Sequence, residues 1–384
     1  MNDRTAQKRL VTLQDVAREA GVSKATAARV LGSYGTASPE VKEKVLTAAR
    51  ALGYQPNELA RSMTTGRSRT IGVIVGDIEN PYFGQAVRGI SEVASAAGFD
   101  VILANSGEKV GKERAAVQVL LGKRVDGLII TPASMSDIQH LEGVQRSGRP
   151  LVLLDRAVPK LRVDSVITDD QAAAAAATRM LIEAGHRRIA YITATASDDP
   201  IYRGPHQINL TTVMDRIDGF LAASAEAGIE RPEHYIRLGA TRQGASERII
   251  ADLLSMPRRP TAILASDNVV GLEVFKVIRN LGLSIPSDLS LIAFHDADWT
   301  SVTSPPITVI SQPVYDLGAQ SARILIKRID GATGTPNRLV LATKMIERQS
   351  VGAPPAAQDG LKKAKPRPVA KAASGKTRAA SMKP

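Results

Sequence analysis

The chain of 384 residues has room for two or three domains, each with a hydrophobic core of its own. It contains no cysteine, which excludes disulfide bonds and thiolate metal sites, and its five histidines are scattered without the spacing of metal ligands. The net charge is +12, and its positive part comes from the two ends: residues 1–70 hold 12 Lys and Arg against 6 Asp and Glu, residues 361–384 hold 8 against none, and the middle of the chain is left with −2. We therefore expect the ends to bind a polyanion, and we expect no metal site and no cofactor.

The chain shows no membrane signal. Its first ten residues lack the apolar core of a signal peptide, and no run of about 18 apolar residues occurs elsewhere. These two features predict a cytoplasmic protein.

Residues 12–31 are typical of two short helices around a tight turn. In the first helix apolar residues recur at the spacing of a single helical face, and Thr12 with Asp15 forms a capping pattern at its start. A glycine can end this helix, and Ser23 suits the cap of the second. With a third amphipathic helix over residues 39–52, this pattern predicts a helix-turn-helix headpiece.

The second helix would present its polar side to solvent. Arg29 could bond a guanine through two hydrogen bonds, Ala25 could contact a thymine methyl group, and the hydroxyls of the turn would fix the register on phosphates. A helical hairpin inside a larger core is the alternative that the pattern leaves open. The predicted DNA-binding residues of this unit are Thr12, Ser23, Lys24, Ala25, Thr26 and Arg29.

Five ordered motifs run through the chain: TLQDVAREAGVSKATAARVL (12–31), LGYQPNELARSM (52–63), GVIVGDIENPYF (72–83), VDGLII (125–130) and GHRRIAYI (185–192). Together they closely resemble the LacI/GalR family of bacterial transcription regulators, over roughly residues 11–350. The resemblance implies an all-α headpiece in residues 1–55 and a two-lobe body similar to periplasmic binding proteins. It also implies a regulator, expected to be a repressor, that a small-molecule effector controls.

Residues 56–69 separate the headpiece from the body. Asn57 could cap two helical turns, which are too short to be stable alone. The resemblance implies a hinge helix that orders when paired hinges enter the minor groove, with Met63 as the apolar wedge where the family has leucine. A plain linker is the other interpretation. The predicted DNA contacts in this segment are Asn57, Ala60 and Met63.

Residues 70–350 alternate short, continuously apolar segments with amphipathic helices. This pattern predicts an α/β body of two lobes, each a parallel sheet with helices on both faces. A final hairpin-like pair of strands is expected around residues 339–347. Ligands of such sheets bind beyond the carboxyl ends of the strands, which in a two-lobe body means the cleft between the lobes.

Polar residues follow several of the predicted strands. Carboxylates, an arginine and aromatic faces together suit a sugar or sugar acid, and Arg216 matches an effector-contacting position of the family. For Asp77 and Asp267 a turn or helix-capping role is equally open. The predicted effector-binding residues are Asp77, Asn80, Tyr82, Phe83, Asp155, Arg156, Arg216, Ser266, Asp267, His295 and Asp296.

Two features depart from the family pattern. His295 stands where the family usually has an aspartate, which gives the site a group that can donate or accept a hydrogen bond near neutral pH. Residues 194–212 match no family motif and are expected to form a specificity loop. The identity of the effector therefore does not follow from the resemblance.

The last segment, residues 351–384, changes to Ala, Pro, Lys, Arg and Ser and is predicted to be a disordered basic tail. It would add nonspecific attraction to DNA or serve solubility alone. One headpiece reads only a few base pairs. The expected partners are thus a near-palindromic double-stranded DNA operator, a carbohydrate-like effector and further copies of the chain, in a homodimer or a tetramer.

Two other classes of protein share part of this pattern. A two-lobe sugar-binding transport protein would account for the body but not for the headpiece. An enzyme on an α/β sheet would need recognisable machinery, yet no G-x-G-x-x-G follows the first strand and no acid–base set stands at a recognisable spacing. The sequence therefore predicts a regulator without catalytic residues.

Overall fold

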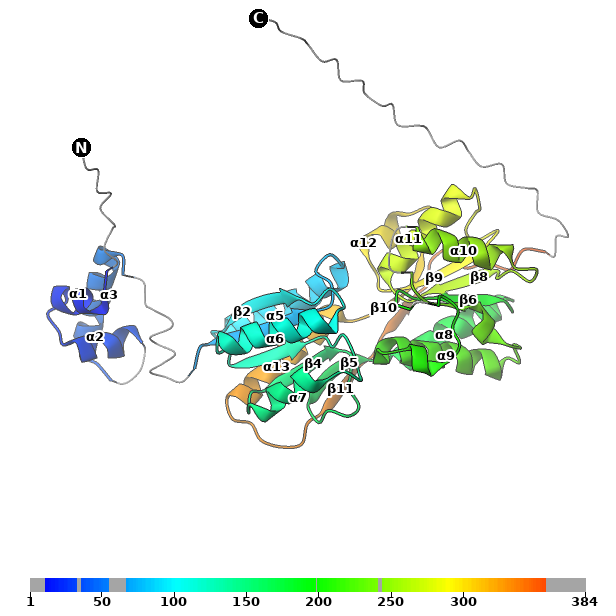
Figure 1. Ribbon diagram of the computed structural model, residues 1–384. Coiled ribbons are helices and arrows are strands. Elements are labelled where there is room, and N and C mark those ends of the chain that lie inside the picture. Colours follow the sequence, from blue (N-terminus) through cyan, green and yellow to red (C-terminus); the bar gives the residue numbers. More distant parts are fainter. Residues whose placement is uncertain (1–10, 33–35, 55–66, 198, 241–243, 357–384) are drawn as a thin grey trace, which may run out of the picture.

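The computed structural model describes residues 11–32, 36–54, 67–197, 199–240 and 244–356. Its N-terminal unit consists of α1 (Leu13–Glu19), α2 (Lys24–Leu31) and α3 (Pro39–Leu52) (Figure 1). The predicted caps are present, since Thr12 and Asp15 form a reciprocal capping box and Ser23 accepts a hydrogen bond from the backbone of Thr26. The three helices enclose a small core of buried residues: Val16, Ala17, Ala27, Val45, Ala48 and Ala49.

Lobe 1 is built on a parallel six-stranded sheet with the order β11-β5-β4-β3-β1-β2. One hydrophobic cluster packs α5 and α13 against the sheet, and another packs α6 and α7 against it. The elements of lobe 1 are β1 (Thr70–Val75), α5 (Pro81–Ala96), β2 (Asp100–Asn105), α6 (Val110–Gly122), β3 (Gly127–Ile130), α7 (Gln139–Arg146), β4 (Leu151–Asp155), β5 (Asp164–Thr168), α13 (Val314–Ile329) and β11 (Arg338–Leu341).

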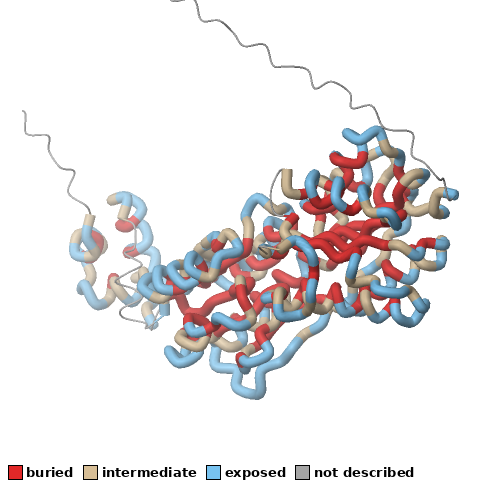
Figure 2. Tube along the Cα trace, turned by 45° about the vertical axis from the view of Figure 1, so that its right-hand side comes forward, coloured by how far each residue is buried: buried red, intermediate tan, exposed pale blue. Residues whose placement is uncertain are grey.

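Lobe 2 repeats this plan with the strand order β12-β10-β9-β8-β6-β7, in which β12 runs antiparallel to β10. Figure 2 shows the buried residues concentrated in the interior of the lobes, where the inner strands lie, whereas the edge strands β2, β11 and β12 are partly exposed. The elements of lobe 2 are α8 (Asp170–Glu183), β6 (Ile189–Ile192), η1 (Pro205–Gln207), α9 (Thr211–Glu226), η2 (Pro232–Tyr235), β7 (Ile236–Arg237), α10 (Ala245–Ser255), β8 (Ala262–Ala265), α11 (Asn268–Asn280), β9 (Ser290–Phe294), α12 (Asp298–Val302), β10 (Thr308–Ser311) and β12 (Lys344–Ile346). The predicted two-lobe α/β fold is confirmed.

Glycine permits the closest helix contact of lobe 1. A Cβ atom on Gly318 of α13 would lie 1.9 Å from the carbonyl oxygen of Ala86 in α5, and one on Gly89 would lie 2.2 Å from that of Tyr315. Both distances are far below van der Waals contact. The two helices can therefore pack backbone to backbone only because these side chains are absent.

The chain crosses between the lobes three times, at residues 168–170, 311–314 and 341–344. The crossings contact one another, because the Gln312 amide lies 3.5 Å from the Thr168 hydroxyl and the Thr343 amide donates to Asp169 at 2.8 Å. The third crossing separates the two last strands, which the sequence predicted to form a hairpin-like pair. β11 and β12 are not a hairpin: each joins the edge of a different sheet, β11 beside β5 and β12 beside β10.

Candidate functional site

The exposed side of α2 carries the predicted base-reading residues. Lys24, Ala25 and Arg29 are exposed there, whereas Ala27 is buried in the core of the headpiece. The guanidinium group of Arg29 lies along its own helix, 3.4 Å from the Thr26 hydroxyl and 3.4 Å from the Ala25 carbonyl oxygen. Hydrogen bonds of this length are weak, so the side chain can extend towards DNA at little cost.

The predicted hydroxyl contacts build the turn that holds this helix. Ser23 Oγ accepts a hydrogen bond from the Thr26 amide at 3.1 Å and lies 2.9 Å from Thr26 Oγ1. Thr12 Oγ1 donates to the Asp15 carboxylate at 2.7 Å at the start of α1. The three remaining DNA-binding predictions lie outside the described residues: Asn57, Ala60 and Met63.

Tyr82 joins the two lobes at the carboxyl ends of their strands. Its hydroxyl donates a hydrogen bond to Asp155 at the end of β4. Its ring meets that of His295, which follows β9 in lobe 2, edge to face with the centroids 5.4 Å apart. Phe83 packs against Tyr82 at 5.3 Å. Four predicted effector residues, far apart in sequence, therefore form one cluster.

A second contact between the lobes involves Asn80. Its Oδ1 caps α5 by accepting from the Tyr82 amide at 3.0 Å, and it also accepts from Asn268 Nδ2 of lobe 2 at 2.9 Å. Asn268 was not among the predicted residues, although it follows a buried strand as the predicted ones do. The structure thus adds it to the candidate site.

Arg216 of α9 is buried within lobe 2. It donates to Asp170 at 2.7 Å and to the Ser266 carbonyl oxygen at 2.6 Å, and its guanidinium carbon lies 4.1 Å from the centre of the Phe294 ring. Burial raises the pKa of Asp170, and the charge of Arg216 opposes that rise. The pair joins α9 to Asp170, which lies directly after the first crossing between the lobes.

Arg156 forms its hydrogen bonds within lobe 1. It forms a two-fold ion pair with Glu108, at 2.6 and 2.8 Å, and donates to the carbonyl oxygen of Pro132 at 3.0 Å. Asp155 is buried beside it, and burial raises the pKa of this carboxyl group. Arg156 therefore neutralises Glu108 and partly offsets the charge of Asp155.

The other predicted carboxylates have local partners. Asp267 caps α11 by accepting from the amides of Val269 and Val270 at 2.9 Å each, and it also accepts from the Ser266 hydroxyl at 2.8 Å. Asp77 accepts from the Glu79 amide at 3.0 Å. Asp296 pairs with Arg348 at 2.7 Å and with the Thr300 hydroxyl at 2.9 Å. These contacts give all three a structural role.

Several buried polar atoms of the two lobes have no hydrogen-bond partner among the described residues. They include both ring nitrogens of His295. The Nε atom of Arg156 also lacks a hydrogen bond within the described ranges, but it lies 3.5 Å from a carboxylate oxygen of Asp155 in an ion pair. Two further atoms of this kind belong to residues that the sequence analysis did not indicate. They are Thr131 Oγ1, directly after β3, and the hydroxyl of Tyr191 in β6. Burial lowers the pKa of His295 and raises that of Tyr191, so both side chains are uncharged at neutral pH.

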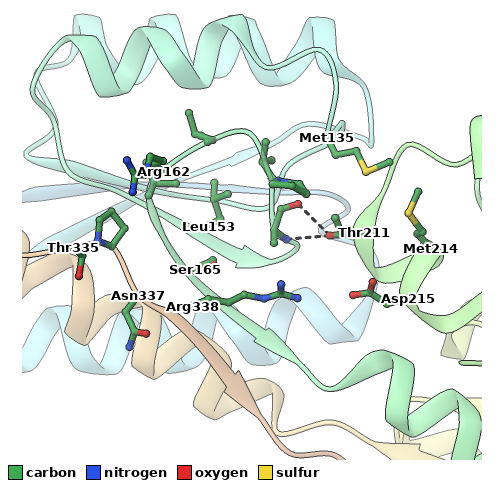
Figure 3. A pocket seen from close by; sticks show the side chains of 16 residues that line it. Met135, Leu153, Arg162, Ser165, Thr211, Met214, Asp215, Thr335, Asn337 and Arg338 are labelled. Atoms are coloured by element: carbon green, nitrogen blue, oxygen red, sulfur yellow. Dashed lines mark hydrogen bonds between the residues drawn. The ribbon is translucent and has the colours of Figure 1, made fainter. Parts of the chain in front are cut away.

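A separate cavity of about 500 Å³ has walls from both lobes (Figure 3). Thr211 of lobe 2 closes one side, where its hydroxyl donates to the Ala157 carbonyl oxygen and accepts from the Ala157 amide, each at 3.1 Å. Arg338 points towards Asp215 across it. None of the predicted effector residues lines this cavity.

Two family models match the chain. Residues 12–57 match the bacterial regulatory proteins of the lacI family, and residues 68–349 match the periplasmic binding proteins and sugar binding domain of the LacI family. The first match covers the three-helix unit with α2, and the second covers both lobes and the cluster between them.

Individual proteins resemble the chain over nearly their whole length. Catabolite control protein A of Priestia megaterium is 32% identical over 340 residues, which are 88% of this chain and 99% of that protein. The structure of the transcriptional regulator CelR in complex with cellobiose matches with a TM-score of 0.65 and 29% identity, covering 88% of this chain and 99% of that one. The lac repressor dimer bound to operator and the anti-inducer ONPF matches with a TM-score of 0.76 and 26% identity, covering 90% and 100%. From its headpiece to its second lobe, the protein belongs to the LacI family of bacterial regulatory proteins.

Proposed function

We propose that the protein is a transcriptional repressor that binds a near-palindromic operator and responds to a carbohydrate-like effector held between its lobes. The observation that carries the proposal is a set of buried polar atoms without a hydrogen-bond partner among the described residues, on His295, Thr131 and Tyr191. Leaving a buried polar atom without a hydrogen bond costs about 1–3 kcal/mol. A polyol can supply both donors and acceptors to these atoms and thereby stabilise the closed cleft.

The charges of the cluster favour a neutral sugar over a sugar acid. Arg156 is paired with Glu108, and Arg216 is paired with Asp170. An anionic ligand would have to compete with these carboxylates for the two guanidinium groups. Cellobiose, the neutral sugar bound by the similar regulator CelR, is consistent with this preference.

The proposed DNA contacts are the exposed residues of α2, with Arg29 reading a base and Ser23 and Thr26 placing the turn on phosphates. Asn57, Ala60 and Met63 would contact the minor groove. A homodimer would match two half-sites, and the lac repressor bound to its operator as a dimer supports this arrangement. Whether two dimers join as a tetramer is a separate question, which sedimentation would answer.

We infer no catalytic activity, because the family that the chain belongs to consists of regulators. No helix among the described residues is long and apolar enough to cross a membrane. A regulator that binds the chromosome acts in the cytoplasm, and we propose that location. A two-lobe sugar-binding protein without a DNA role is the alternative, and the headpiece argues against it.

The proposal is tested in two steps on the full chain. First, selection from a random duplex library identifies the preferred sequence, and a recovered near-palindrome is expected. Second, operator affinity is titrated in the presence of cellobiose, ribose, gluconate and hypoxanthine. A neutral sugar should change operator affinity, and its effect should disappear in Arg216→Met. No sequence preference in the first step would contradict the repressor proposal, and a response to gluconate alone would contradict the preference for neutral sugars.

A further inference from the structure

Asp126 holds the chain at the point where it enters the body. Its Oδ1 accepts hydrogen bonds from the amide and the hydroxyl of Ser68, at 2.8 and 3.0 Å, and its Oδ2 accepts from the Arg69 amide at 2.9 Å. Asp126 is only 8% exposed. Hydrogen bonds to an ionised carboxylate are stronger than those between neutral groups, and burial strengthens them further. Residues 68 and 69 are therefore fixed on lobe 1.

The conformation of Arg69 depends on this carboxylate. Arg69 has a φ of 53°, in the left-handed region that is unfavourable for residues other than glycine. Its guanidinium carbon lies 5.2 Å from the centre of the Phe99 ring, and its carbonyl oxygen accepts from the Asp100 amide at 2.8 Å. Such a conformation persists only when several contacts enforce it. Asp126 supplies the contact to its amide.

Arg67 extends the attachment to the helix that returns from the crossing. It bonds to Asp330 at 3.0 Å and to the Ile329 carbonyl oxygen at 3.2 Å, at the end of α13. α13 begins directly after the second crossing, where Gln312 lies next to Thr168. The segment leading towards the headpiece is thus tied to a rigid helix that starts where the lobes are joined.

We propose that Asp126 is a positioning residue for operator binding, which fixes where the linker leaves lobe 1 so that the state of the lobes reaches the DNA-binding helices. The inference rests on the proposed function and deepens it by naming a residue of its regulation. Without the carboxylate, Ser68 and the Arg69 amide would lose their hydrogen bonds to lobe 1, and the segment would open more often. The headpieces would then be free to bind DNA, but no longer held at the spacing of the operator.

Asp126→Asn tests the attachment directly. The amide would place an NH2 group opposite the donor of Arg69 or of Ser68, so at least one hydrogen bond is lost. Ser68→Ala removes one donor and leaves the backbone unchanged. Asp252→Asn is the matched control, because Asp252 pairs with Arg237 at 3.0 Å in lobe 2, away from the linker.

Limited trypsin digestion of the full chain, with mass spectrometry, measures cleavage after Arg67 and Arg69. Asp126→Asn should raise the rate at these two sites by about tenfold, as expected for the loss of one charged hydrogen bond, and Ser68→Ala by less. Asp252→Asn should leave the rate at wild-type level. Unchanged cleavage in both linker variants would overturn the attachment.

Binding to the selected operator and to a scrambled duplex of equal length measures the consequence. Asp126→Asn should lower the ratio of specific to nonspecific affinity about tenfold, with nonspecific affinity and the affinity for cellobiose unchanged. If Asp126 had a purely structural role, the substitution would lower the specific, nonspecific and cellobiose affinities together or would change none of them. Faster cleavage with an unchanged ratio would therefore overturn the positioning role alone. A wild-type protein without any sequence preference would overturn the proposed function, together with the inference that rests on it.

Discussion

Arg216 and Asp170 lie 2.7 Å apart and connect the candidate effector site to the first crossing between the lobes. Asp170 is the first residue of α8, two positions after the last residue of β5, and its carboxylate also accepts from the Thr168 hydroxyl at 3.0 Å. A ligand that forms hydrogen bonds with the guanidinium group of Arg216 would weaken its ion pair with Asp170. The pair thus offers a route by which binding can shift the relative stability of two lobe arrangements.

Replacing one member of this pair should be costly. Arg216→Met leaves Asp170 buried without its partner, and the free energy of unfolding should fall by about 3 kcal/mol or more. The double variant Arg216→Met with Asp170→Asn should recover part of that loss, because no unpaired charge remains. Urea unfolding of the wild type, the two single variants and the double variant measures both effects. A double variant less stable than the sum of the two single losses would contradict the pairing.

His295 should make the stability of the body depend on pH. Burial lowers its pKa in the folded protein, whereas an unfolded histidine titrates near about 6.5. Below that pH the unfolded chain binds more protons, so the free energy of unfolding should fall as the pH falls through about 6.5. His295→Gln should reduce this fall. Burial also lowers the pKa of His186, but that contribution is common to both proteins. Identical pH slopes, measured by urea unfolding, would refute the role of His295.

Arg29 should provide part of the protein's preference for its operator over other DNA sequences. Arg29→Ala removes the side chain proposed to read a base, and the preference for the selected operator should fall by about 1–3 kcal/mol, concentrated at one position of each half-site. Arg50→Ala is the control, since Arg50 is also an exposed cation of the headpiece, and its partner is Glu43 on its own helix. Competition titrations with single-base operator variants compare the two. An even loss over all positions would mean that Arg29 contacts phosphate only.

Met63 tests the proposed minor-groove wedge. Met63→Gly should weaken operator binding more than binding to a scrambled duplex, because only the specific complex gains from inserting an apolar side chain between base pairs. Met63→Leu preserves the apolar volume and should bind as the wild type does. Equal losses on both duplexes for the glycine variant would support the plain-linker interpretation.

Local sequence determined most of the secondary structure and the nature of the N-terminal unit. The caps at Thr12 and Ser23 and the single apolar face of each headpiece helix depend on contacts within a few residues, which spacing alone reveals. Continuous apolar strands likewise predicted the two parallel sheets. The short strand β7 and the helices α10 and α12 were not predicted, because two to eleven residues of mixed polarity give a weak periodic signal.

Only the tertiary structure decided which polar residues meet. The sequence placed Asp155, Asp267 and Asp296 alike after strands, yet Asp155 is bonded to Tyr82, while Asp267 caps a helix and Asp296 pairs with the distant Arg348. Likewise, β11 and β12 read as a hairpin because they are consecutive. Their actual partners depend on which sheet edge is free when both lobes have formed, a property of the assembled fold that no local pattern of residues contains.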